Sequence, residues 1–333
     1  MTSFAVRAAP LSDSAEVSRV ILSANPHLEE RIQRFLASGG RWAHATAVVG
    51  EVDNHIRSCA VVFRRELWIS ADERARIGGI GAVSTHPSAR GQGYATRVLR
   101  FCEELLAREG HRLAGLFCNI VEFYRRLGWL PIEEDFLEFV CESPWPNFQN
   151  PNYRICAVDS GIPQKALEEL CERAAPESAS ALVRSPEIWN DYQHWHRDDD
   201  DLRWAALIGD MPVAFVRGRR TPTGVLLQEA IALSQHQPAL LTLIGRQAQI
   251  AGERKQFQTN LSRQHPLAKL LEQKGAKHCW KKTSGQTTML MLKTLKPGLS
   301  HSHGLSTERF LTIQDFERKF PWEPRTWWAI DRF

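Results

Sequence analysis

The stretch Val83–Phe101, VSTHPSARGQGYATRVLRF, decides the fold of the first half of the chain. It follows the apolar run RIGGIGA at 76–82, which suits a strand buried on both faces. Beyond two closely spaced glycines, apolar residues recur at helical spacing from Val98 to Leu106. The sequence therefore predicts a buried strand, a glycine turn and a helix that begins near Tyr94.

The glycine turn predicts a site for an anion. Gly91 and Gly93 lack Cβ atoms, so a ligand can approach the backbone closely. The first N–H groups of the following helix have no partner inside the helix, and they carry a partial positive charge. Arg90 adds a permanently charged guanidinium just before the turn. These features favour a phosphate or diphosphate bound over residues 91–96.

Two common phosphate-binding motifs do not fit this turn. The string GxxxxGK[ST] of a Walker loop does not occur in the sequence. The strings GIGAVS and GQGYAT carry Ser84 and Thr96 where the dinucleotide-binding fingerprint requires its last small residue. The pattern that remains is Arg90–x–x–Gly93–x–Ala95.

This pattern resembles the diphosphate-binding motif [QR]-x-x-G-x-[GA] of the GCN5-related N-acetyltransferase (GNAT) superfamily. The string FYRRLGW at 123–129 is similar to a second signature of that family. The resemblance covers roughly residues 3–142, and the whole chain resembles the tandem-domain acetyltransferases of the enhanced-intracellular-survival type. It implies an acyl-CoA-dependent N-acyltransferase that uses acetyl-CoA as acyl donor and a primary amine, on a small molecule or a peptide, as acceptor.

The resemblance also implies which residues bind the acyl donor. The main chain of Val83, Ser84 and Thr85 would pair with the amide groups of the pantetheine arm. Beside Arg90, the diphosphate would lie on the main-chain N–H groups of the turn and the helix start: Gly91, Gln92, Gly93, Tyr94, Ala95 and Thr96.

For catalysis, Tyr124 matches the usual general acid of the family, which protonates the departing CoA sulfur. A phenol with a reference pKa of about 10 need only donate as the thiolate leaves. In the tandem subset the terminal carboxylate acts in the first domain, which makes the carboxylate of Phe333 a candidate general base. Other candidates are carboxylates of the first half: Glu51, Glu66 and Glu122. A non-catalytic acyl-CoA sensor or scaffold is the alternative function.

The chain divides into two similar halves. Residues 1–142 form the predicted catalytic domain, and 143–152, with three Pro and three Asn, form a linker. Residues 153–296 repeat the order strand, helix, hairpin, strand, helix, strand, helix, strand, and the aromatic tail 297–333 is expected to dock on the domains. The predicted fold class is α/β (α+β), with two tandem GNAT-like domains, each a mixed, mostly antiparallel sheet flanked by helices. The second is degenerate, because its turn at 231–245 lacks the motif.

Composition excludes several partners. The 333 residues are 43% hydrophobic and 24% charged, which is typical of a soluble globular protein. A net charge of +4 without a Lys/Arg block argues against nucleic acid as a partner, and no apolar run is long enough for a membrane span.

The N-terminus lacks the residue order of a signal peptide, and the seven Cys contain no CxxC pair, so a cytoplasmic protein with reduced thiols is expected. The His-rich and Asp-rich runs at 194–201 and 301–303 resemble solvated loops, so no metal is expected.

The acceptor amine cannot be identified from the sequence. Residues 24–35 and 64–73 are the variable segments expected to contact it. The second domain is expected either to cover the acceptor cleft or to form a homodimer.

Overall fold

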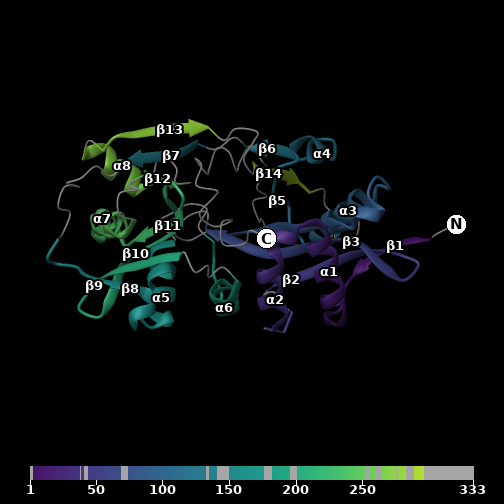
Figure 1. The fold of residues 1–333 in the computed structure, drawn as a ribbon, viewed down its shortest axis with the longest axis horizontal. Coiled ribbons are helices and arrows are strands. Elements are labelled where there is room, and N and C mark those ends of the chain that lie inside the picture. Colours follow the sequence, from purple (N-terminus) through teal and green to yellow (C-terminus); the bar gives the residue numbers. More distant parts are fainter. Residues whose placement is uncertain are drawn as a thin grey trace, which may run out of the picture.

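A computed structural model describes residues 3–37, 39–40, 44–68, 74–132, 135–140, 150–175, 182–195, 201–251, 256–259, 265–274, 276–282 and 289–295. The described elements form two seven-stranded sheets with helices on their faces, one sheet for each half of the chain (Figure 1). Of the predicted linker only residues 150–152 are described, and the tail 297–333 lies outside the described residues.

The two halves contain the same order of strands and α-helices. The first half runs β1 (Phe4–Ala8), α1 (Ser14–Ala24), α2 (Glu29–Ala37), β2 (Ala45–Val52), β3 (His55–Trp68), β4 (Arg74–Thr85), α3 (Tyr94–Arg108), β5 (Leu113–Cys118), α4 (Val121–Arg125), β6 (Leu130–Ile132) and β7 (Asp135–Val140). The second half runs β8 (Arg154–Ala157), α5 (Gln164–Ala174), α6 (Pro186–Trp195), β9 (Asp201–Ile208), β10 (Met211–Thr221), β11 (Gly224–Ala232), α7 (Ala239–Ala251), β12 (Gln256–Thr259), α8 (Pro266–Gln273), β13 (His278–Lys282) and β14 (Met289–Thr294). The repeated order confirms the predicted duplication and fold class.

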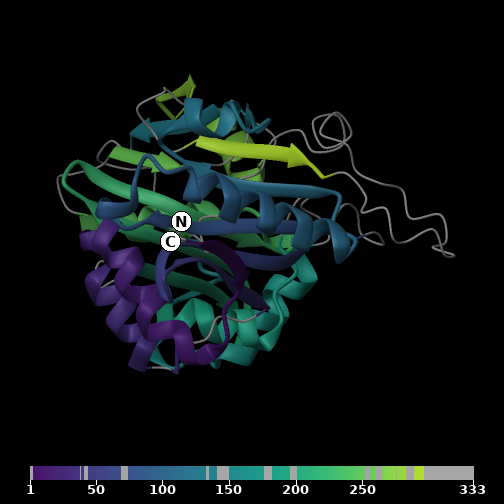
Figure 2. The same cartoon turned by 90° about the vertical axis from the view of Figure 1, so that its right-hand side faces the viewer.

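Each sheet is completed by the last strand of the other half. The first sheet has the order β1-β2-β3-β4-β5-β14-β6, and the second has the order β13-β7-β12-β11-β10-β9-β8. Figure 2 shows the yellow-green β14 running beside the blue strands of the first half. The predicted limits 1–142 and 153–296 stay predictions, but neither sheet is built from one of these ranges alone. Sequence patterns show that β7 and β14 are strands, whereas their partners depend on tertiary packing.

The first sheet is covered by helices on both faces, as the alternation of β3 requires. On one face Ala60 and Val62 of β3 pack in a cluster with α3 residues, among them Val98 and Leu99. On the other face Cys59, Val61 and Phe63 pack against α1 and α2: Val17, Val20, Ile21, Ile32 and Phe35. The sheet therefore fixes the position of α3 relative to β4.

β4 and β5 separate along their length. They form a parallel pair only through Gly78 with Ala114 and Gly79 with Gly115, although β4 continues to Thr85. The register between β3 and β4 shifts between Cys59 and Val61, which marks a bulge in the strand pair. On the bulged strand, Ala82 has a φ of +50°. A bulge bends its strand, which accounts for the opening between β4 and β5.

Helix α6 corrects one expectation. The segment around residues 192–204 reads as a charged loop, yet α6 extends to Trp195. Its start has the usual signals, because Pro186 is the first helical residue and Ser185 accepts a hydrogen bond from the Ile188 N–H at 3.4 Å. In the part of the chain that the structure describes, no helix is long and apolar enough to cross a membrane.

Candidate functional site

The free edge of β4 faces the opening toward β5. The carbonyl of Ser84 accepts a hydrogen bond from the Ser58 hydroxyl of β3 at 3.1 Å, and the His86 N–H donates to the Arg57 carbonyl at 2.9 Å. Backbone groups alternate along a strand, so Thr85, which lies between these two residues, is expected to direct its main-chain groups to the opposite side, as is Val83 on the other side of Ser84. Of the three residues predicted to contact pantetheine, Ser84 turns its carbonyl to β3, whereas Val83 and Thr85 are expected to direct their main-chain groups toward the opening.

The glycine turn lies at the end of this opening. Gly91 and Gly93 have φ of +78° and +74°, which is the left-handed region that favours glycine. A Cβ atom placed on either residue would meet no heavy atom of the described residues within 4 Å, so these residues leave the space over the turn open. Gly93 is the N-cap of α3, and no side chain of the described residues caps this helix start. The first N–H groups of α3 are therefore free of a side-chain cap, as an anion site requires.

The first turn of α3 is anchored to β1. The ring of Tyr94 stacks on Phe4 with centroids 4.2 Å apart, and Arg97 donates to the Phe4 carbonyl at 3.1 Å. The Arg97 guanidinium also lies 4.2 Å above the Phe4 ring. Arg90 is exposed and its Nε lies 3.4 Å from the Thr85 carbonyl, so its charge stands at the end of β4. These contacts hold the predicted diphosphate-binding residues in one place.

Tyr124 lies close to the same opening. It belongs to the cluster that contains Ile80 of β4 and Cys118 at the end of β5, and Val83 packs against this cluster. Its side chain is buried, with 5% of the residue exposed. Burial, and to a lesser extent the neighbouring Cys118, raises the pKa of the Tyr124 phenol above its ordinary value. The phenol is therefore protonated at neutral pH, as a proton donor must be.

The carboxylates predicted as alternative bases are held by arginines. Glu51 accepts a hydrogen bond from Arg7 at 3.1 Å, and Glu122 pairs with Arg125 one turn further along the chain. Glu66 lies 4.0 Å from Arg76 at the far end of β4. Phe333, the remaining candidate, lies outside the described residues. The general base thus stays a prediction.

The corresponding opening of the second half is bridged by a side chain. Each half has a short 3-10 helix after this strand, Pro87–Ala89 in the first half and Ser234–His236 in the second. Val83 and Ala230 each lie four positions before the first residue of that helix, so the two residues correspond. The ring nitrogen Nε2 of His265 donates to the Ala230 carbonyl at 3.0 Å, because Nδ1 of the same ring accepts the Leu267 N–H. The protein's own histidine therefore uses the backbone group that corresponds to the Val83 carbonyl, for which no hydrogen bond is found among the described residues of the first half.

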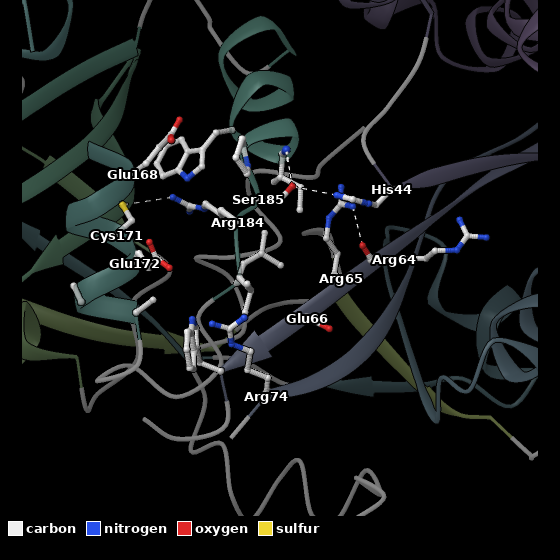
Figure 3. A pocket seen from close by; sticks show the side chains of 18 of the residues that line it. His44, Arg64, Arg65, Glu66, Arg74, Glu168, Cys171, Glu172, Arg184 and Ser185 are labelled. Carbon is white, nitrogen blue, oxygen red and sulfur yellow. Dashed lines mark hydrogen bonds between the residues drawn. The ribbon is translucent and has the colours of Figure 1, made fainter. Parts of the chain in front are cut away.

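A cavity of about 800 Å³ lies between the two halves (Figure 3). The end of β3 and the start of β4 form one wall, and α5 with residues 182–189 forms the other. Arg184 of the second wall pairs with Glu229 of β11, and 9% and 3% of these side chains are exposed. The cavity therefore contains a buried ion pair, which also lies 4.9 Å from the Trp189 ring.

This cavity is distant from the glycine turn. Arg64, which lines the cavity, pairs with Gly78, and Gly78 is five positions from Val83 on β4, or roughly 17 Å at the rise of a strand. Arg64, Arg65, Glu66 and Trp68, from the segment expected to contact the acceptor, line this cavity. The other expected segment does reach β4, because Asn25 donates to the Ser84 hydroxyl at 3.1 Å.

The two runs considered as metal ligands in the sequence cannot be placed relative to the site. The side chains of the run at 194–201 and the run at 301–303 are not among the described residues. Within the part of the structure that is described, no three His, Cys, Asp or Glu residues cluster in a way that could hold a metal ion.

A family model matches part of the first half. Residues 16–132 match the model described as an acetyltransferase (GNAT) domain. The matched range contains the splayed strands, the glycine turn and Tyr124. A search of curated proteins finds no match.

Solved structures have the fold of the whole chain. A probable N-acyltransferase from Enterococcus faecalis V583 is 16% identical with a TM-score of 0.66, over 89% of this chain and 73% of its own. Eis1 from Mycobacterium abscessus is 14% identical with a TM-score of 0.61, and the match covers 88% of this chain and 74% of Eis1. A tandem GNAT protein from the clavulanic acid biosynthesis pathway is 11% identical with a TM-score of 0.53, and the match covers 89% of this chain and 100% of that protein. At these identities the likeness shows a common fold of two tandem domains.

Proposed function

Because residues 16–132 match the model of a GNAT acetyltransferase domain and the whole chain has the fold of a solved tandem GNAT protein, we propose that this protein is an N-acetyltransferase. It transfers an acetyl group from acetyl-CoA to a primary amine. The observation that carries the proposal is the combination of the opening between β4 and β5 with the uncapped glycine turn at its end.

The donor fits the first half and not the second. The main-chain groups of Val83 and Thr85 would pair with the pantetheine arm, and the N–H groups of residues 91–96 would bind the diphosphate beside Arg90. In the second half, Pro238 precedes α7 where the first half has glycine, and His265 already binds Ala230. We therefore expect the protein to bind one acetyl-CoA per chain.

The reaction needs a base, an oxyanion donor and an acid. The neutral amine nitrogen attacks the thioester carbonyl carbon, and a C–N bond forms as the C–S bond breaks. The Val83 N–H would donate to the oxyanion, which leaves the Val83 carbonyl for the pantetheine arm. Tyr124 gives its phenolic proton to the departing CoA thiolate, and the base removes the extra proton from the amine.

A thiol-release assay tests the proposal. Acetyl-CoA would be mixed with spermidine, kanamycin, L-lysine or a lysine-containing peptide, and free CoA thiol would be recorded alongside calorimetry of acetyl-CoA binding. Amine-dependent thiol release together with binding at one site per chain supports the enzyme. Binding without turnover of any amine would favour the sensor, and no binding would reject both.

The proposed role of the Phe333 carboxylate has its own test. Two or three residues added after Phe333 move the terminal carboxylate, so kcat should fall while acetyl-CoA still binds. The same residues added before Met1 serve as the control. Unchanged kcat in the C-terminally extended protein would exclude the carboxylate as the base.

A further inference from the structure

Lys293 joins the second half of the chain to the surroundings of Tyr124. It lies on β14, the strand that the second half inserts between β5 and β6. Its ammonium group donates to Glu103 of α3 at 2.7 Å and to the main-chain carbonyl of Leu127 at 2.6 Å. With 21% of the Lys293 side chain exposed and 14% of Glu103, the contact is largely shielded from water.

The Leu127 carbonyl belongs to the turn that ends α4. The Leu127 N–H donates to the Tyr124 carbonyl at 2.9 Å, and the Trp129 N–H reaches the same carbonyl at 3.2 Å. Gly128, with a φ of +85°, lies between them. A lysine near a helix end can satisfy a carbonyl that lacks a partner inside the helix. Lys293 therefore fixes the turn through which the backbone of Tyr124 is held.

The same ammonium group also acts on the ring beside Tyr124. The Trp129 indole N–H donates to Glu103 at 3.0 Å, and Glu103 in turn accepts from Lys293. Trp129 is fully buried, and its ring meets that of Tyr124 edge to face with centroids 6.4 Å apart. Backbone and ring contacts of Tyr124 thus both lead to Lys293.

We propose that Lys293 is a positioning residue for Tyr124, supplied to the first domain by the second half of the chain. This rests on the proposed function, in which Tyr124 donates a proton to CoA. A proton donor must lie within hydrogen-bonding distance of its acceptor, and a misplacement of about 1 Å can cost up to 100-fold in rate. The half that has no glycine turn thereby contributes to the chemistry of the other.

The position of the tyrosine ring can be measured without an acceptor. The chain has four tyrosines, so labelling with 3-fluorotyrosine gives a small ¹⁹F spectrum in which Tyr124→Phe assigns one signal. Lys293→Met should shift or broaden the Tyr124 signal and leave that of Tyr153 unchanged. Lys269→Met, an exposed lysine on α8, is the matched control and should change neither signal. An unchanged Tyr124 signal in Lys293→Met overturns the proposal.

Kinetics distinguishes positioning from a general structural role. With whichever of the four amines gives the highest kcat/KM, Lys293→Met should lower kcat about 10-fold and leave the acetyl-CoA Kd within about twofold. In the Tyr124→Phe background the same substitution should have no further effect on kcat, because the group that it positions is gone. An equal loss in both backgrounds overturns the proposal.

One further variant, together with Tyr124→Phe, separates the remaining outcomes. Fewer acetyl-CoA sites per chain in Lys293→Met would mean that part of the protein is misfolded because Glu103 has lost its partner. The double variant Lys293→Met/Glu103→Gln removes that carboxylate charge, and its kcat should still be lower than that of the wild type. Wild-type kcat in the double variant overturns the proposal. If Tyr124→Phe lowers kcat and Lys293→Met does not, the positioning role alone fails. If Tyr124→Phe has wild-type kcat, the acid role in the proposed function fails, and the role of Lys293 fails with it.

Discussion

Ala82 has a φ of +50°, in a region that residues with a Cβ rarely occupy. Such a conformation costs on the order of 1 kcal/mol and persists only where the surroundings impose it. Here it lies in the bulge that directly precedes Val83, at the opening between β4 and β5. The strain of one residue thus accompanies the exposure of the main-chain groups proposed to bind the acyl donor.

Tyr124→Phe tests the acid. The substitution removes the hydroxyl and keeps the buried ring, so kcat should fall by about 100-fold or more, while the Kd for acetyl-CoA stays within about twofold. Because burial raises the pKa of the phenol, the wild-type protein should not lose its acid as the pH rises from 8 to 10. A kcat profile recorded over this range, with the variant as control, checks both statements. A loss of wild-type activity that follows an ordinary tyrosine pKa would contradict them.

Gly93→Ala tests the glycine turn. At a φ of +74° an alanine is strained by about 1–2 kcal/mol, and its Cβ would enter the open space over the turn. Acetyl-CoA binding measured by calorimetry should weaken about tenfold or more, which corresponds to about 1.4 kcal/mol. Gly209→Ala is the matched control, because Gly209 also has a left-handed φ, +60°, with no atom near its Cβ position. Equal affinities in the two variants would mean that no ligand lies over Gly93.

At the scale of elements, β14 connects the two halves. It pairs with β5 along its whole length, from Met289 with Cys118 to Thr294 with Leu113, and its other edge pairs with β6. Leu290 and Leu292 pack in one cluster with Leu182 and Ile188 of the second half. A strand paired on both edges and buried between the halves should contribute strongly to stability.

Leu292→Ala tests this contribution. Leu292 is fully buried, so the substitution should lower the free energy of unfolding by about 2–5 kcal/mol, measured in urea. Leu130→Ala is the control, because Leu130 pairs directly with Leu292 on the neighbouring strand but is 50% exposed. It should cost less than about 1 kcal/mol. Similar losses in both variants would show that β14 does not bury Leu292 in the native protein.

At the scale of the molecule, the exchange of β7 and β14 makes the halves interdependent. Neither half carries all the strands of its own sheet. The main chain also joins the halves at their edges, where the Val183 N–H donates to the Glu66 carbonyl at 2.9 Å. Together with the Lys293 contacts, this arrangement explains how a domain without a glycine turn can still support the first site. The expected homodimer stays a prediction.

Separate expression tests this interdependence. Residues 1–142 alone lack β14, and β5 and β6 would each expose an unpaired edge. This fragment should show no cooperative unfolding by circular dichroism and no binding of acetyl-CoA. Co-expression with residues 143–333 should restore both. A fragment 1–142 that folds and binds acetyl-CoA like the full chain would contradict the exchange.

The sequence by itself determined the features whose causes are local. The glycine turn, the start of α3 at Tyr94 and the repeated order of elements follow from glycine chemistry and hydrophobic periodicity, which act over a few residues. The start of α6 carried a local signal of the same kind, Ser185 before Pro186, so it could have been predicted.

Only the tertiary structure decided which strands pair and which side chains meet across the chain. The hydrogen bond from Lys293 to Glu103 joins residues 190 positions apart, and that from His265 to Ala230 joins residues 35 apart. Strand patterns do not specify partners, because any strand edge offers the same main-chain groups. Burial of each apolar face selects among them, and that selection placed β14 beside β5 and β7 beside β12.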